Sequence, residues 1–396
     1  MGSKAVVVGG GVIGSSVVFA TAALAQKTGK SVEITLVEGS EVASGASGKA
    51  GGLLALDWHG HSTASLAELS YTLHAALAKQ YDGASRWGYR RLDTLSISAD
   101  LSSTGKARTS RKLKGADVFP WLNKDVLTGS DILGSPDTTA QVHPEQFTRA
   151  MVELAQERGV KLVLGTATKL QKPSSPNEPY RLTVQSRDAA GEERVLEADQ
   201  IVIAAGPWTG RLLGELDLRS KAGRAAGIEG SRAHSVVLKT APGRDLPAQA
   251  VFTSIKTKSG HAEPEIYNRP DGTAYACGPT DGSPLPTHAS SVTVDDRAIS
   301  LLLQQTAHLS PDHLDSTEAA EGGARAEVVK RQACFLPVGS GDPVIGWIDG
   351  VGDKGVLVAS GHSCWGICNG PGTGQVVAEL LLEGKAKSAN ISSLRP

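Results

Sequence analysis

The chain contains few aromatic residues and few cysteines. Phenylalanine, tryptophan and tyrosine make up 4% of its 396 residues, and four cysteines are present. Four cysteines are too few for the disulfide framework of a small secreted protein, so we expect a reducing compartment: the cytoplasm, or an organelle if a transit peptide has been removed. No apolar run approaches the ~18 residues that a membrane-spanning helix needs, so we expect a soluble protein that does not bind a membrane.

Neither sign of charge is in excess. The 40 lysines and arginines nearly balance the 41 aspartates and glutamates. A neutral surface does not steer a protein toward nucleic acid, so no nucleic-acid partner is expected. One short basic segment lies between positions 106 and 114. We interpret it as a solvated loop, with a partner-docking site as the alternative.

Glycine, in contrast, is abundant. The chain has 46 glycines, which is about 12% where about 7% is usual. Glycine lets a backbone approach a ligand closely. The length exceeds that at which a single core stops growing, which favours two domains. Cysteine and histidine show no zinc-ligand spacing, so no metal is expected.

A glycine motif stands near the start of the chain. Gly9, Gly11 and Gly14 fit the pattern G-x-G-x-x-G between a predicted strand and a predicted helix. The first glycine permits a tight turn, the second lets the backbone approach a pyrophosphate, and the third lets helix and strand pack closely. Glu38 ends the next predicted strand and is placed to accept hydrogen bonds from ribose hydroxyls. The pattern predicts a dinucleotide site and does not distinguish FAD from NAD.

The segment after Glu38 is rich in small residues. It reads Ser-Gly-Ala-Ser-Gly-Lys-Ala-Gly-Gly over residues 44–52, and it offers N–H and O–H donors to a pyrophosphate and a ribityl chain. The segment resembles the second flavin fingerprint of the D-amino-acid-oxidase-like oxidoreductases, which include sarcosine oxidase and glycine oxidase. This resemblance implies FAD as the cofactor and disfavours the alternative of an NAD-dependent dehydrogenase.

The resemblance extends over nearly the whole chain. Residues 201–208 are similar to the family's strand that ends beneath the cofactor. Near the C-terminus we predict a strand over residues 355–360, a glycine-rich turn over 361–374 beside the flavin ring, and a helix over 375–382. Backbone N–H groups of that turn would stabilise a reduced flavin. The residues that the resemblance assigns to the cofactor are Gly9, Gly11, Val12, Ile13, Gly14, Glu38, Ser44, Ser47, Ala50, Gly51, Gly52, Leu53, Thr168, Ala205, Gly206, Trp208, Cys334, Gly361, His362, Trp365, Gly366 and Ile367.

Candidate catalytic residues are expected around the flavin ring. They are His362, Trp365, Tyr267 and Trp58. Aromatic side chains over a flavin would suit a flat or cationic amine, and an arginine would suit a carboxylate. Further candidates for the substrate pocket are His59, Glu265, Ile266, Arg269 and Arg90. For all of these residues a purely structural role is the alternative.

The cysteines raise three further questions. Cys334 falls where sarcosine and fructosyl-amine oxidases carry the cysteine that is joined to the flavin C8 methyl group. The resemblance therefore allows a covalent flavin, although a buried thiol that acts as a small hydrophobe is favoured. Cys368 stands where sarcosine oxidases carry a lysine that holds the substrate carboxylate. Cys364 and Cys368 are spaced C-x-x-x-C, so a dithiol redox pair is a minor alternative.

The fold that we expect is α/β. A Rossmann-like FAD-binding domain would be assembled from residues 1–60, 138–215 and 335–396, and a mainly antiparallel β substrate domain from residues 61–137 and 216–334. The expected function is oxidation of a C–N bond of a small-molecule amine or amino acid by hydride transfer to flavin N5. Residues 274–278 have no counterpart of the lysine that helps oxygen react in the sarcosine oxidases, so oxidase and dehydrogenase both stay open. The alternative is a flavoprotein with a partner-binding or trafficking role and little turnover.

Overall fold

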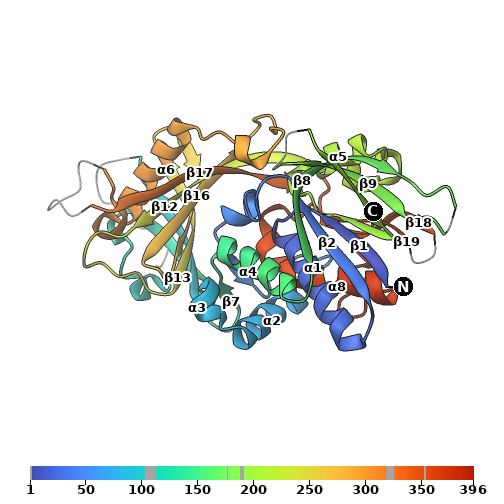
Figure 1. The fold of residues 1–396 in the computed structure, drawn as a ribbon. Helices are drawn as coiled ribbons and strands as arrows, with labels where there is room; N and C mark the ends of the chain where they lie inside the picture. The colour runs from blue at the N-terminus through green and yellow to red at the C-terminus, as the bar shows by residue number, and fades with distance from the viewer. Residues whose placement is uncertain (1, 103–112, 176, 188–190, 318–324, 352–353) are drawn as a thin grey trace.

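Two large β-sheets, with helices packed on them, make up the protein (Figure 1). The computed structural model describes residues 2–102, 113–175, 177–187, 191–317, 325–351 and 354–396. Most of the basic segment at positions 106–114 lies outside these residues. None of the helices in the described ranges has the length and apolar character that crossing a membrane requires.

The first sheet has a parallel centre. Its strands run in the order β10-β9-β8-β2-β1-β11-β19-β18, and the five from β8 to β19 are parallel. These five are β8 (Lys161–Gln171), β2 (Val32–Glu38), β1 (Ser3–Val8), β11 (Gln200–Ile203) and β19 (Lys354–Ser360). The antiparallel strands are β9 (Tyr180–Ser186), β10 (Glu193–Ala198) and β18 (Val344–Val351). Central parallel strands are buried on both faces, as the four buried residues at the end of β1 illustrate.

Helices cover one face of this sheet. They are α1 (Val12–Thr28), α4 (Pro144–Gln156) and α8 (Gly366–Glu383), with α2 (Ala64–Gln80) packed against α8. Val7, Val202 and Leu357 of the strands point into this core. Their neighbours along the strands point into a second core that includes Leu212 and Leu213 of the short helix α5 (Thr209–Glu215). The alternation follows from the two-residue period of a strand.

The second sheet is mainly antiparallel. Its path is β17-β12-β16-β15-β13-β5-β6, and only β13 and β5 on this path run parallel in the described residues. Its strands are β5 (Asp93–Asp100), β6 (Leu127–Gly134), β12 (Glu229–Lys239), β13 (Gln249–Thr257), β15 (Glu265–Asn268), β16 (Thr273–Asp281) and β17 (Glu327–Val338), with β14 (Gly260–Ala262) paired to β13. The helix α6 (Asp296–Leu309) packs on one face. A small third sheet joins β3 (Leu53–Ala55), β7 (Thr139–Gln141) and β4 (Arg90–Arg91).

The predicted fold class, a Rossmann-like α/β unit combined with an antiparallel β unit, is confirmed. The strands of the first sheet come from residues 1–60, 138–215 and 335–396. The second sheet draws on residues 61–137 and 216–334, although β17 crosses position 334 and α2 packs on α8 of the other unit. The division into domains at these positions stays a prediction.

The predicted glycine-rich turn over residues 361–374 is wrong in its second half, because α8 already begins at Gly366. The glycines serve close helix packing instead. A Cβ atom on Gly374 would lie 2.4 Å from the backbone oxygen of Ser16 in α1. Gly372 meets the backbone of α2 in the same way. Glycine lets these helices approach each other, and a sequence pattern does not distinguish that use from a turn.

Pro371 interrupts the hydrogen bonding of α8. Proline has no backbone N–H, so the carbonyl of Ile367 has no donor from within the helix. Nε2 of His74 in α2 lies 2.9 Å from that carbonyl oxygen, and the Ser70 hydroxyl donates to the carbonyl of Cys368 at 2.6 Å. One helix thus completes the backbone hydrogen bonds of another.

Replacement of His74 by glutamine is expected to flatten the dependence of stability on pH. Burial lowers the pKa of His74 to about 4. The unfolded chain binds this proton below about pH 6.5, so acid favours the unfolded state until the folded pKa is reached. Between about pH 7.5 and pH 5 the wild type should lose about 2 kcal/mol more unfolding free energy than His74→Gln, which keeps a donor without titrating. Urea unfolding at both pH values measures the difference, and an equal loss in the two proteins would contradict it.

Candidate cofactor site

A cavity of about 750 Å³ opens at the carboxyl ends of the parallel strands. Its walls are formed by the segments that follow β1, β2, β11 and β19. Ligands of open α/β sheets bind in this crevice, and the volume lies within the range of small-molecule and cofactor sites.

The first glycine turn forms one edge of the cavity. Gly9 has a φ of +114°, and a Cβ atom on it would lie 2.3 Å from the backbone oxygen of Ala204. A Cβ atom on Gly14 would lie 1.9 Å from the backbone oxygen of Gly9, so helix α1 starts directly against the turn. The first turn of α1 has no acidic side chain, and the N–H of Val12 donates to the Ser47 hydroxyl at 2.8 Å. The positive end of α1 therefore faces the cavity and suits a phosphate group.

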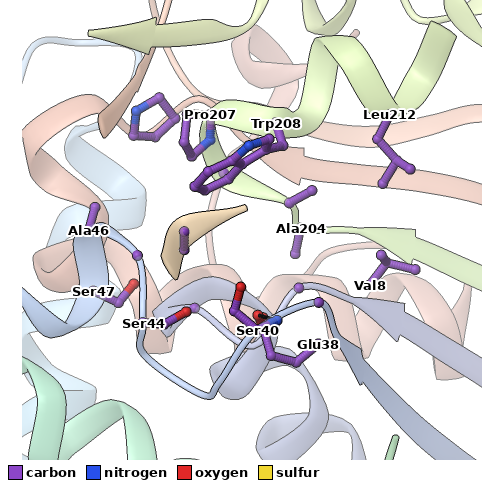
Figure 2. A pocket seen from close by; sticks show the side chains of 18 of the residues that line it. Val8, Glu38, Ser40, Ser44, Ala46, Ser47, Ala204, Pro207, Trp208 and Leu212 are labelled. Atoms are coloured by element: carbon purple, nitrogen blue, oxygen red, sulfur yellow. Dashed lines mark hydrogen bonds between the residues drawn. The ribbon is translucent and has the colours of Figure 1, made fainter. Parts of the chain in front are cut away.

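Glu38 lies at the end of β2 and braces the turn. Its carboxylate accepts hydrogen bonds from the N–H of Gly10 at 2.6 Å and of Ser40 at 2.7 Å. Burial raises the pKa of Glu38, and these two hydrogen bonds oppose the rise. Figure 2 shows Glu38, Ser40 and Ser44 together on one side of the cavity. The remaining acceptor sites of the carboxylate are available to ribose hydroxyls.

The segment over residues 44–52 crosses from the cavity to the second sheet. Ser44, Ser47 and Ala50 line the cavity. Gly51 and Gly52 do not, and a Cβ atom on Gly51 would lie 2.4 Å from the ring of Tyr267. Leu53, which begins β3, also lies outside the lining. The glycines of this segment thus make room for protein as well as for a ligand.

The opposite wall comes from β11 and from a loop of the second sheet. Ala205, Gly206 and Trp208 line the cavity here. Thr168 also lines the cavity, from β8, the neighbour of β2 in the sheet. Figure 2 shows Trp208 across the cavity from Glu38. The Trp208 indole N–H donates to the backbone oxygen of Pro286 at 2.7 Å, which ties this wall to the adjoining loop.

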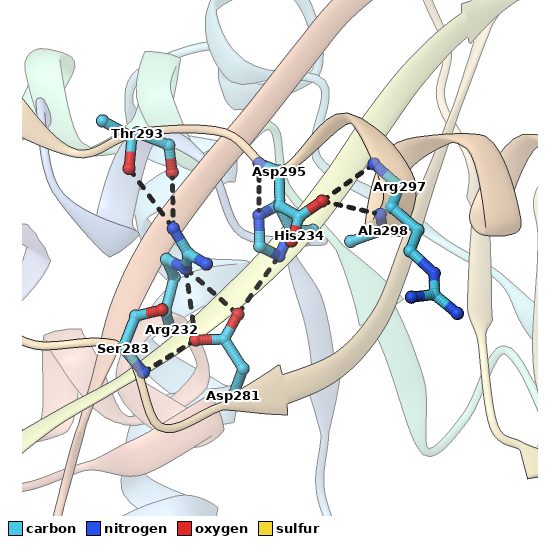
Figure 3. A network of polar contacts seen from close by, with 8 residues as sticks. All are labelled: Arg232, His234, Asp281, Ser283, Thr293, Asp295, Arg297 and Ala298. Carbon is cyan, nitrogen blue, oxygen red and sulfur yellow. Dashed lines mark hydrogen bonds and ion pairs between the residues drawn. The ribbon is translucent and has the colours of Figure 1, made fainter.

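A polar network fixes that loop at both ends (Figure 3). Residues 287–290 of the loop line the cavity. Arg232 of β12 contacts the Asp281 carboxylate at 3.1 and 3.2 Å and the backbone oxygen of Thr293 at 3.1 Å. His234 accepts a hydrogen bond from the N–H of Asp295 at 3.0 Å. The network holds the cavity wall in place and supplies no nucleophile.

The turn after β19 forms the floor of the cavity. Gly361, with φ of +81°, His362, Gly366 and Ile367 line it. Nε2 of His362 lies 3.0 Å from the Thr373 hydroxyl oxygen, whereas Nδ1 is buried without a partner in the described residues. Burial lowers the pKa of His362 to about 3, so its ring is neutral. The ring therefore adds no charge to this part of the cavity wall.

The donors and acceptors of the cavity match the parts of a flavin dinucleotide. The N-terminus of α1 suits the pyrophosphate, Glu38 the ribose, and the turn with His362 the ring. The family of FAD dependent oxidoreductases known as DAO matches residues 4–380. The chain belongs to the DAO family. FAD is therefore its cofactor, and the alternative of an NAD-dependent dehydrogenase is excluded.

Relatives of this DAO-family protein match it over almost their whole length. A Schizosaccharomyces pombe protein whose name describes an oxidoreductase without a substrate is 38% identical, over 99% of this chain and 97% of the relative. The glycine oxidase of Geobacillus kaustophilus shares the fold with a TM-score of 0.75 at 22% identity, covering 99% of this chain and 98% of that one. The L-proline dehydrogenase of P. horikoshii has a TM-score of 0.70 at 17% identity, covering 100% and 97%. At these identities the two solved structures show the fold.

Of the four candidate catalytic residues, His362 lines the cavity. Trp365, Tyr267 and Trp58 lie outside the lining. Trp365 lies against His59, with ring centroids 4.3 Å apart. Trp58 packs edge-on against Phe252 of β13 at 5.3 Å, and Phe252 packs against Tyr267 at 5.8 Å. Their contact with a substrate stays a prediction.

The two candidate arginines also lie outside the lining. Arg269 is buried, donates to the backbone oxygen of Ala50 at 3.2 Å and lies over the Tyr275 ring at 5.1 Å. Arg90 donates to the backbone oxygen of Asn268 at 2.9 Å. The Arg269 contact connects residues 44–52, which we call the flavin segment, to the second sheet, and the Arg90 contact connects β4 to β15. Both side chains therefore have a structural use.

The cysteines are all free thiols. Cys364 lines the cavity. Cys368 is buried, donates to the backbone oxygen of Ala55 at 3.5 Å and lies 3.7 Å from Nε2 of His59. Burial raises the pKa of Cys368 to about 12, so it is an uncharged thiol where a carboxylate would need a cation. Cys334 is buried in β17 beside Lys49, whose ammonium donates to the backbone oxygen of Ala333 at 3.0 Å.

FAD is expected to be released when the protein is denatured with acid. Burial raises the pKa of Cys334 to about 11, so this residue is a thiol at neutral pH and a poor nucleophile toward a flavin methyl group. After precipitation the flavin absorbance should appear in the supernatant, equally for the wild type and Cys334→Ser. A yellow pellet from the wild type that becomes colourless in Cys334→Ser would contradict the expectation.

Some residues of the cavity wall were not predicted. They are Ser40, Gln185, Ser186 and Arg187 at one end and the loop of residues 287–290 at the other. Arg187 donates to the backbone oxygen of Ser40 and pairs with Glu41 at 3.3 Å. The β8–β9 hairpin brings Gln185, Ser186 and Arg187 to the cavity. No local motif marks them.

Proposed function

We propose that the protein oxidises a C–N bond of a small amine or amino acid. Bound FAD supplies, at N5, the acceptor for a hydride from the carbon that bears an unprotonated amine, and the imine product then hydrolyses in water. The residues of the chain have to orient that carbon, keep the amine neutral and exclude bulk water.

The observation that carries the proposal is an aromatic row formed by Phe252 and Tyr267 of the second sheet and by Trp58 of the loop after β3. Trp58, Phe252 and Tyr267 are in edge contact, and the Tyr267 ring lies against Gly51 of the flavin segment. An apolar surface next to a flavin desolvates an ammonium group and so lowers the pKa of the amine. The neutral ring of His362 adds no charge to the site. The hydride step itself requires the amine in its neutral form.

The solved relatives support the same class of reaction. Two of them are named for amino acids, one as a glycine oxidase and one as an L-proline dehydrogenase. These names pair one fold with an oxidase and with a dehydrogenase, and oxygen and another electron acceptor are both compatible with the geometry.

Anaerobic reduction of the flavin tests the proposal. The purified holoprotein is mixed without oxygen with a panel of primary amines, secondary amines and amino acids, and absorbance is followed near 450 nm, where flavins absorb. At least one member of the panel should bleach the band and yield an imine-derived carbonyl product. If dithionite bleaches the flavin and no member of a broad panel does, the alternative of a partner-binding or trafficking flavoprotein is favoured instead.

A further inference from the structure

A carboxyl group stands on the face of the second sheet that carries the aromatic row. Glu265 of β15 lies directly between Phe252 of β13 and Cys277 of β16 in the strand register, and directly opposed residues share a face. Tyr267 lies on the same face two residues further along β15. Of the residues of β15, Glu265 alone is not fully buried.

One oxygen of this carboxyl group is already occupied. Oε2 of Glu265 accepts a hydrogen bond from the Tyr267 hydroxyl and one from the Cys277 thiol, whose sulfur lies 3.7 Å away. Burial raises the pKa of Tyr267 and of Cys277 well above their ordinary values, so both groups keep their protons and act as donors. The two donors fix the orientation of the carboxyl group and leave Oε1 for another partner.

Among the residues that the structure describes, no cation balances this carboxylate. In the described residues no lysine, arginine or histidine forms an ion pair with Glu265, and the neighbouring charge that acts on it is the like charge of Glu263. A largely buried carboxylate without a cation is costly to keep ionised. Its natural complement is therefore a cation that enters from solution.

Glu265 does not itself line the cofactor cavity, and its position relative to the cavity follows from its neighbours. Burial raises the pKa of Cys364, which lines the cofactor cavity in the turn after β19, and the negative charge of Glu265 adds to this rise. Tyr267, which holds Glu265, touches Gly51 of the flavin segment. The carboxylate thus lies on the side of the flavin turn, and Cys368, which follows that turn in α8, is a buried thiol that supplies no positive charge.

We propose that the Glu265 carboxylate binds the positively charged amine of the substrate, and that the preferred substrates are amines without a carboxylate on the reacting carbon. The substrate preference rests on the proposed amine oxidation, whereas the binding of a cation by Glu265 does not. Once bound, the ammonium passes one proton to Oε1: an N–H bond breaks, an O–H bond forms, and the neutral amine that hydride transfer requires remains. The raised pKa of Glu265 suits this acceptor role.

Binding of non-oxidisable probes tests the proposal without turnover. Benzyltrimethylammonium has no nitrogen lone pair to drive hydride loss, and benzoate is a flat anion of similar size. Each is titrated into holoprotein while the flavin absorption spectrum is recorded. The wild type should bind the cation more tightly than benzoate, and Glu265→Gln should weaken cation binding at least about 10-fold. Glu265→Asp, which keeps the charge, should retain the preference for the cation.

Glu263→Gln is the matched control, because Glu263 is an exposed carboxylate two residues away that pairs with His261. It should change cation binding less than about twofold, since exposed charges are screened. FAD content and unfolding temperature verify that each variant is folded. Equal cation binding by Glu265→Gln and wild type, tighter binding of benzoate than of the cation by the wild type, or no cation binding at all would overturn the proposal.

A second measurement separates this proposal from the proposed function. The rate of anaerobic flavin reduction is compared for phenethylamine and phenylalanine, which differ by one carboxylate. If phenethylamine reduces the flavin faster than phenylalanine does, and Glu265→Gln removes this difference, both amine oxidation and the Glu265 proposal are supported. Faster reduction by phenylalanine overturns the substrate preference while amine oxidation stands. Glu265-dependent cation binding without reduction by any amine leaves the cation site in place and removes the proposed function.

Discussion

A protein in which Gly14 is replaced by alanine is expected to lose its FAD. The new Cβ atom would lie 1.9 Å from the backbone oxygen of Gly9, far inside van der Waals contact. Backbone cannot yield as a flexible side chain does, so the turn must move away from α1 and carry its phosphate-facing N–H groups with it. We expect FAD affinity to fall at least about 100-fold, or about 2.8 kcal/mol, and the free energy of unfolding to fall by about 1–3 kcal/mol.

Gly214→Ala is the matched control for this substitution. Gly214 lies in α5, where a Cβ atom would meet nothing within 4 Å. Alanine is the better helix former, so stability should stay equal or rise by up to about 1 kcal/mol, with FAD affinity unchanged. Quenching of flavin fluorescence on titration of apoprotein gives the affinities, and urea unfolding gives the stabilities. Wild-type affinity in Gly14→Ala would show that the turn does not depend on close contact with α1.

Loss of the Glu38 carboxylate is expected to be nearly as damaging. In Glu38→Ala the N–H groups of Gly10 and Ser40 lose their acceptor, and a buried donor without a partner costs about 1–3 kcal/mol. The ribose of FAD would lose its partner as well. We expect FAD affinity to fall about 100-fold or more.

In the wild type, FAD affinity should also fall as acid protonates Glu38. Because burial raises the pKa of this carboxyl, the fall begins nearer neutral pH than for a free glutamate.

The control for Glu38 lies on the same strand. Glu33 of β2 is exposed and pairs with Lys161 at 2.6 Å, away from the cavity. Glu33→Gln should leave FAD affinity unchanged, since exposed ion pairs contribute little. If Glu38→Ala binds FAD as Glu33→Gln does, the carboxylate neither braces the turn nor contacts the ribose.

What could be predicted from the sequence is what depends on neighbours along the chain. The tight turn, its closing helix and the acid at the end of β2 are encoded by Gly9, Gly14 and Glu38 within one strand–helix–strand unit. The strand predicted over residues 355–360 lies within β19 (Lys354–Ser360), because a run of apolar and β-branched residues is also a local signal. The family resemblance distinguished FAD from NAD, because the residues after Glu38 that carry it are contiguous in the sequence, as those of the turn are.

What could not be predicted depends on contacts between distant segments. Gly372 and Gly374 look like turn residues until the backbones of α1 and α2 are placed against them. Glu265 accepts a hydrogen bond from Cys277 because the register of β15 and β16 places the two residues opposite each other. Arg187 reaches the cavity wall because of the pairing of β8 with β9. Register and helix packing are properties of the assembled core, and no short motif encodes them.

Because α2 completes the interrupted hydrogen bonding of α8, we expect flavin binding and the stability of α2 to be coupled. The N–H of Gly372 in α8 donates to the Ser70 hydroxyl of α2 at 2.9 Å. The turn that faces the flavin is therefore held partly by a different element. By linkage, coupling between the two is mutual: the free energy by which a bound flavin stabilises α2 equals the free energy by which an ordered α2 strengthens flavin binding. Cofactor retention in this protein is thus shared between the cavity wall and a helix that does not line the cavity.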